Sequence, residues 1–160
     1  MNAKDLHGMA VVSLGEANKL GAVDDVWFDA HWRTVLGFGL QHDAHHAPEG
    51  ILRSSVTAIG HDVLTVAHAD ALIDIAQHPL FQTAVSLRQL VGTHVVSEQG
   101  DVLGTIDDVE LDATGQTVQA YLLSMSLLER LGQQQHKIAV DRVIQVGVGN
   151  LMTVSQSSAT

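Results

Sequence analysis

The feature that most constrains the fold is an internal repeat, because two copies of one pattern within 160 residues leave room only for small modules. The matching segments keep their order and spacing apart from short insertions. In the first and second copy they are 6–13 and 90–97, 21–30 and 104–113, 34–35 and 117–118, and 63–66 and 151–154. The repeat predicts two similar modules in tandem, with Asp25 equivalent to Asp108.

Short apolar runs separated by turn residues make each copy read as a set of strands. The segments 98–101 and 112–116 combine acidic or polar residues with Gly, which is typical of hairpin loops because Gly adopts positive φ without steric conflict. The composition agrees with this, since 46% hydrophobic and 16% charged residues suit a packed, strand-rich body. The sequence therefore predicts a mainly β fold of two small barrels.

A pair of aspartates interrupts the second predicted strand of each copy. The apolar residues that flank each pair cannot lie on the same face of a regular strand, because side chains alternate between faces. We therefore expect a structural bulge or turn at each pair. Paired carboxylates could also serve acid–base chemistry or a hard metal ion, but successive strand residues diverge, which favours the structural role. The pairs are Asp24 and Asp25, and Asp107 and Asp108.

The segment between the copies has a different pattern. Apolar residues at helical spacing over 70–78, followed by Pro79, predict a short connecting helix. A capping box at 126–129 predicts another short helix inside the second copy. The expected organisation is a first barrel at 1–68, a helical linker at 69–87, a second barrel at 88–156 and a disordered tail at 157–160.

Three motifs resemble the PRC-barrel family. They are Gly-x-x-Val-Val-Ser at the start of each copy, Gly21-x-Val23-x-Asp25-Val26 with its partner Gly104-x-Ile106-x-Asp108-Val109, and Val56-x-x-Ile59-Gly60-x-Asp62-x-x-x-Val66. The resemblance covers nearly the whole chain in two copies, apart from the linker. The sequence is similar to the cytoplasmic domain of photosynthetic reaction-centre H subunits, and the family also occurs in a ribosome-maturation factor and in stand-alone bacterial and archaeal proteins.

The resemblance implies small open β-barrels that bind proteins or help a partner to fold or assemble. It brings no catalytic residues. The sequence lacks the membrane helix of the H subunit and the other domain of the maturation factor, so neither specific function is carried over.

The net charge of −10 and the absence of cysteine exclude several classes of function. Few basic residues disfavour binding to nucleic acid or to an anionic membrane surface. Without cysteine there are no disulfides, thiolate nucleophiles or cysteine-type zinc sites. The first residues lack a signal-peptide pattern, and no apolar run reaches the ~18 residues of a membrane helix, so we expect a soluble, cytoplasmic protein.

The cluster most similar to a metal site is His42, Asp43, His45 and His46. Imidazole and carboxylate are good ligands for zinc or nickel. The cluster falls in a predicted loop and follows no established ligand spacing, which favours a solvated loop. We expect no structural metal and no other cofactor.

Two tryptophans distinguish the first copy from the second. Trp27 stands where the second copy has Glu110, and Trp32 where it has Gly115. Either they pack against the linker or the other barrel, or they form a partner-binding surface, in which Trp is enriched. The second alternative predicts self-association, with a homodimer as the form expected.

No Gly-x-Ser-x-Gly elbow or Gly-x-x-x-x-Gly-Lys-Ser/Thr phosphate loop is present, so we expect no enzymatic activity. The function that the sequence favours is a protein-interaction, adaptor or assembly module whose protein partner is unknown. One alternative is a small-ligand or metal-binding protein that uses the His-rich loop of the first copy. A further alternative is an RNA-processing or ribosome-associated factor, which the acidic charge weakens.

Overall fold

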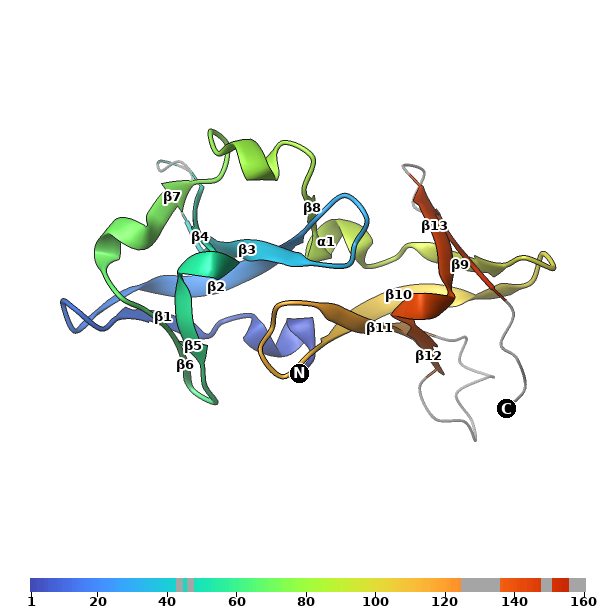
Figure 1. The fold of residues 1–160 in the computed structure, drawn as a ribbon, viewed down its shortest axis with the longest axis horizontal. Coiled ribbons are helices and arrows are strands. Elements are labelled where there is room, and N and C mark those ends of the chain that lie inside the picture. The colour runs from blue at the N-terminus through green and yellow to red at the C-terminus, as the bar shows by residue number, and fades with distance from the viewer. Residues whose placement is uncertain (43–44, 46–47, 125–135, 148–150, 156–160) are drawn as a thin grey trace.

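Two curved sheets, one from each sequence repeat, make up most of the structure (Figure 1). The computed structural model describes residues 1–42, 45, 48–124, 136–147 and 151–155. Within these residues, no helix is long and apolar enough to cross a membrane. The fold is mainly β with two tandem barrel-like modules, which confirms the fold class predicted from the repeat.

The first sheet has eight strands in the order β5-β6-β1-β2-β3-β4-β7, with β8 paired to the second half of β2. Their bounds are β1 (Ala10–Ser13), β2 (Asn18–Phe28), β3 (Val35–Leu40), β4 (Glu49–Leu52), β5 (Val56–Ile59), β6 (Val63–Val66), β7 (Leu72–Asp74) and β8 (Val85–Ser86).

The second sheet has six strands in the order β12-β11-β10-β9-β14-β13. Their bounds are β9 (His94–Ser97), β10 (Val102–Leu111), β11 (Val118–Ser124), β12 (His136–Ala139), β13 (Val143–Gly147) and β14 (Leu151–Val154). Taken from β13 to β12, this order repeats that of the first sheet from β5 to β4. The parallel pairing of β1 with β6 is matched by the parallel pairing of β9 with β14.

The helical elements are single turns. One α-helix, α1 (Leu87–Leu90), is found among the described residues. The 3₁₀ turns are η1 (Ala3–Leu6), η2 (Arg53–Ser55), η3 (Ala69–Ala71), η4 (Pro79–Phe81) and η5 (Val140–Arg142). Of these, η1 and α1 occupy matching positions, one immediately before the first strand of each repeat.

The predicted connecting helix over 70–78 is wrong. The turn η3 overlaps the start of this segment, and the turn η4 begins directly after its end. Between the two turns, Leu72–Asp74 form strand β7. The apolar residues of this short segment are compatible with either structure, and pairing with the edge of β4 decides in favour of a strand. The helix predicted at 126–129 and the predicted tail at 157–160 lie outside the described residues.

Register shifts occur at both aspartate pairs. The pairing of β2 with β3 shifts between Val23 and Asp25, and the pairing of β10 with β11 shifts between Ile106 and Asp108. The structure therefore has an irregularity at the matching place in each repeat. Such an irregularity bends the strand at the position of the aspartate pair.

The two sheets are separate, but their buried side chains form one continuous hydrophobic cluster. An isolated bridge between Thr34 and Thr117, which are equivalent positions, joins the hairpin of one sheet to that of the other. Backbone bonds from Val35 N to Gln116 O, 2.8 Å, and from Val118 N to Arg33 O, 2.9 Å, flank this bridge symmetrically. The two repeats thus pack as a reciprocal pair.

Candidate functional site

The centre of the reciprocal pair is built by an exchange of N-terminal segments. The segment η1, which precedes the first repeat, packs on β10 of the second repeat, while α1 packs on β2 of the first. Figure 1 shows η1, in dark blue, next to the hairpin of the second sheet. Each repeat therefore receives the leading segment of the other.

One aspartate of each pair holds the exchanged segment by its backbone. Asp25 Oδ1 accepts from the N–H of Arg88 at 3.4 Å and from the N–H of Val26 at 2.9 Å. Asp108 Oδ1 accepts from the N–H of Lys4 at 3.0 Å and from the N–H of Val109 at 2.7 Å. Each carboxylate thus joins its own bulged strand to the leading segment of the other repeat.

Local sequence determines the shape of each exchanged segment. The α1 turn begins with a capping box, in which the Ser86 side chain accepts from the Gln89 N–H and the Gln89 side chain accepts from the Ser86 N–H. Gly8 and Gly92 follow η1 and α1 with φ of +85° and +93°, a conformation that disfavours side-chain-bearing residues. The chain can therefore turn directly from the segment into the first strand.

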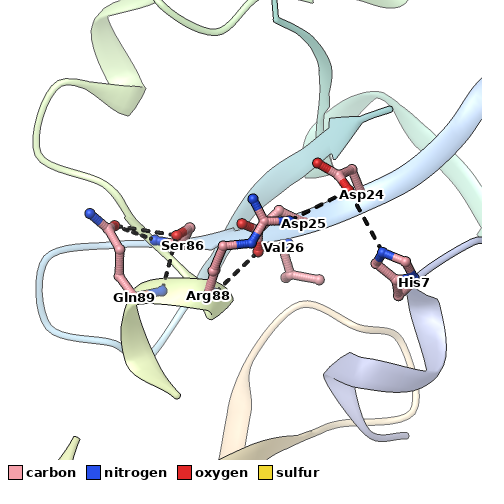
Figure 2. A network of polar contacts seen from close by, with 7 residues as sticks. All are labelled: His7, Asp24, Asp25, Val26, Ser86, Arg88 and Gln89. Atoms are coloured by element: carbon pink, nitrogen blue, oxygen red, sulfur yellow. Dashed lines mark hydrogen bonds and ion pairs between the residues drawn. The ribbon is translucent and has the colours of Figure 1, made fainter. Parts of the chain in front are cut away.

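The other aspartate of each pair makes ion pairs at the surface. Figure 2 shows Arg88 extending from α1 over β2 to Asp24, with His7 on the opposite side of the same carboxylate. Arg88 Nη2 and His7 Nε2 each lie 3.6 Å from Asp24 Oδ1. Lys4 Nζ lies 3.2 Å from Asp107 Oδ1. Exposed pairs such as these contribute about 1 kcal/mol or less to stability.

Burial changes the acidity of the two inner aspartates. Desolvation raises the pKa of both Asp25 and Asp108 above the usual aspartate value, despite the N–H donors that partly offset it. Asp108 is 6% exposed. The ionisation of both carboxyl groups is therefore coupled to folding.

A cavity of about 450 Å³ opens between η1, β2 and α1, and we call it the junction pocket. Its apolar lining comes from both repeats. Ala3, Val23, Val26, Leu87 and Val91 supply this lining. Val91 is 37% exposed, so the pocket offers apolar surface to a ligand or partner.

The polar lining of the junction pocket carries both signs of charge. Lys4, His7 and Arg88 supply basic groups, and Asp24 and Asp25 supply carboxylates. No hydroxyl or thiol side chain is among its described lining residues, so the pocket has an imidazole near a carboxylate but no nucleophile for that pair to activate. The arrangement suits binding of an apolar group flanked by charges.

The predicted site residues do not all meet at this pocket. Asp24 and Asp25 line it, and Asp108 is held by the neighbouring residue Lys4. Sequence reasoning missed Lys4, His7 and Arg88. The available signal was that Lys4 and Arg88 are basic residues two positions before the matching leucines of the two repeats.

Both tryptophans pack within the chain. The Trp27 ring is half-buried and makes an edge-to-face contact with Phe81 of the linker at 5.8 Å between centroids. Trp32 is 6% exposed, and its carbonyl accepts from the Tyr121 hydroxyl of the second repeat at 2.5 Å. In the structure, the tryptophans make the contacts of the first alternative, in which they pack against the linker and the other repeat.

The His-rich loop is only partly described. His42 and His45 are exposed, whereas Asp43 and His46 lie outside the described residues. Within the part of the chain that the structure describes, no three His, Cys, Asp or Glu side chains converge as a metal site would require.

Residues 82–149 match the family model described as PRC-barrel domain. The matched segment spans the exchanged segment α1 and most of the second repeat, and this part of the chain is similar to the PRC-barrel family. The first repeat has the same strand order.

One similar solved structure is the crystal structure of a proposed 16S ribosomal RNA processing protein, RimM, from Pseudomonas aeruginosa. It is 14% identical to this chain, with a TM-score of 0.36, and the alignment covers 97% of this chain and 98% of that one. No curated protein sequence matches the chain.

Proposed function

We propose that the chain is a non-catalytic adaptor that binds a partner protein at the junction pocket. The observation that carries this proposal is the position of the pocket, which is lined by η1 and α1, the leading segments of both repeats. A partner seated there contacts both repeats at once. Binding would therefore depend on the intact tandem pair.

The lining of the pocket supports a protein ligand. Its apolar walls and mixed charges match the usual anatomy of a protein interface, with an apolar centre and a polar rim. The absence of a hydroxyl or thiol nucleophile among the described lining residues is in keeping with a binding role. The net charge of −10 would steer a partner that carries a basic surface.

A single substitution in the pocket tests the proposal. Val91→Arg places a long charged side chain in the pocket at a position that is already 37% exposed, so the fold should be retained. Val102→Arg is the matched control, because Val102 is 70% exposed and lies outside the pocket. Affinity capture from the native cell should recover the same partner with the parent and with Val102→Arg, and should lose it with Val91→Arg.

Two results would contradict the proposal. One is an unchanged set of captured proteins with a folded Val91→Arg variant. The other is equal loss with both variants. Self-association as a homodimer is a separate expectation, and sedimentation equilibrium of the parent chain tests it.

A further inference from the structure

The two sheets differ at one edge. In the first sheet, β7 adds to the outer side of β4 as an antiparallel strand, with Glu49 opposite Asp74, Gly50 opposite Ile73 and Ile51 opposite Leu72 (Figure 1). The linker thus covers this edge. Ile75, the residue after β7, packs so closely on β4 that a Cβ at Gly50 would lie 2.7 Å from Ile75 Cδ1.

The equivalent edge in the second sheet is β12. Phe38 of β3 pairs with Ile51 of β4, and Tyr121 of β11, the equivalent of Phe38, pairs with Ile138 of β12. Ile138 therefore occupies the place of Ile51. In the strand order of the described residues, β12 pairs with β11 and ends the sheet, so no counterpart of β7 covers it.

The register of β7 shows which backbone groups of β12 face outward. The N–H of Ile75 donates to the carbonyl of Pro48 at 3.2 Å, so the carbonyl of Pro48 faces β7. Backbone groups alternate along a strand, and Gly50 and Leu52 therefore face the same way. Their equivalents in β12 are Lys137 and Ala139, both exposed. An edge with outward N–H and C=O groups is a template for another strand.

The side chains of β12 define what the added strand must look like. Lys137 occupies the place of Gly50, which faces Ile73 in the first sheet. The ammonium group of Lys137 is paired with Glu110 Oε2 at 2.7 Å, which leaves its aliphatic stem to contact a neighbour. An aliphatic residue therefore fits opposite Lys137 better than another charged one.

We propose that the outer edge of β12 binds an extended segment of a partner protein as an added antiparallel strand, with an aliphatic residue opposite Lys137. The internal pairing of β7 with β4 is the template for this mode of recognition. The site is distinct from the junction pocket, since none of the pocket's lining residues lies on β12. It does not depend on the adaptor function proposed above.

The probe is a synthetic peptide with the sequence of residues 69–77, which contains β7, added to the full-length ¹⁵N-labelled chain. Amide resonances of His136–Ala139 should shift in a saturable way. In the β7 register the N–H of Ile73 faces the receiving strand and that of Asp74 faces away. Methylation of the Ile73 nitrogen should therefore weaken binding by about tenfold or more, whereas methylation of the Asp74 nitrogen should leave it within about twofold.

A protein variant gives an independent readout. Ala139 has φ of −63°, the value that proline imposes, so Ala139→Pro should keep the melting temperature while removing one outward N–H. Weaker peptide binding by this folded variant is expected. The proposal is overturned if no saturable shift occurs at His136–Ala139 up to ~1 mM peptide, a concentration that detects weak complexes. It is also overturned if both methylated peptides bind equally, if the peptide shifts β4 instead, or if β12 is occupied by a second copy of the chain.

Discussion

The backbone N–H of Lys4 donates to Asp108 Oδ1 at 3.0 Å, although the two residues are 104 positions apart. The matching bond, from the N–H of Arg88 to Asp25 Oδ1, runs in the opposite direction between the repeats. Each bulged strand is therefore completed by the leading segment of the other repeat. We therefore expect the folding unit to be the pair of repeats and not the single barrel.

The first prediction concerns the acceptor role of Asp25. Asp25→Ala leaves the N–H groups of Val26 and Arg88 without their acceptor, and should lower the free energy of unfolding by about 1–3 kcal/mol. Asp25→Asn retains an oxygen acceptor of similar shape and removes a desolvated charge, so it should change that free energy by less than about 1 kcal/mol. Urea unfolding of both variants measures the difference. Equal destabilisation by Asn and Ala would show that the charge, and not the acceptor, holds the segment.

The second prediction is a pH dependence of stability. Burial raises the pKa of Asp25 and Asp108 in the folded chain, so folding favours their protonated forms. Their contribution to stability is complete below the unfolded pKa of 3.8 and is lost as the pH rises through the folded pKa. Replacing both residues with Asn removes this contribution. The double variant should therefore gain stability relative to the parent as the pH rises from about 4 to 7.

Urea unfolding of parent and double variant at several pH values tests this directly. The pH dependence of stability in both proteins also includes other carboxyl groups, such as Asp112. The pKa of Asp112 is lowered because hydrogen bonds from Gln116, Thr114 and Thr117 outweigh its desolvation. They are common to both proteins and cancel in the difference. A difference in stability that does not vary with pH would contradict the prediction.

The third prediction concerns Trp32. Its backbone has φ of +59°, and Trp32→Gly would relieve that strain while copying the Gly115 of the second repeat. Loss of the buried ring outweighs the relief, because truncation of a buried Trp costs about 3–5 kcal/mol and the strain is worth about 1 kcal/mol. We expect a net destabilisation of about 2–4 kcal/mol. Trp27→Glu should have a smaller effect because that ring is half-buried. A fully stable Trp32→Gly variant would exclude a core role for the ring.

How far the sequence predicts the fold can be judged at the aspartate pairs. The apolar residues around Asp24 and Asp25 conflict with strand alternation, and that conflict is local, so it predicts the register shift without knowledge of the fold. The exchange of leading segments is not local. Nothing in the neighbourhood of Lys4 indicates that its N–H pairs with Asp108, because the contact depends on how two barrels pack.

The linker shows the limit in another way. Leu72 and Ile73 have a pattern that suits one helical turn or one strand equally, and the free edge of β4 selects the strand. Trp27 and Trp32 illustrate the same limit, because their comparison with Glu110 and Gly115 reveals an asymmetry but not its cause. The cause at Trp27 is the linker residue Phe81, which covers only the first repeat.

The fourth prediction addresses the RNA-associated alternative. A net charge of −10 opposes the approach of phosphate, so binding of an unstructured RNA should be weaker than ~1 μM in ~150 mM salt. Gel-shift or fluorescence-anisotropy titrations at several salt concentrations measure both the affinity and its salt dependence. Submicromolar binding under these conditions would favour the RNA-associated function over the adaptor.

The last prediction tests the reciprocal pair itself. A protease recognition sequence inserted between Gln82 and Thr83, two exposed residues of the linker, allows the folded chain to be cut between the repeats. The two fragments should stay together through gel filtration because β8 and α1 of the second fragment pack on β2 of the first, and η1 packs on β10. Once the repeats are no longer covalently joined, the unfolding midpoint should rise with protein concentration, as it does for a dimer. The uncut insertion variant is the control, and its midpoint should not depend on concentration. Separation of the cut fragments in native buffer, each still folded, would show that the two barrels are independent domains.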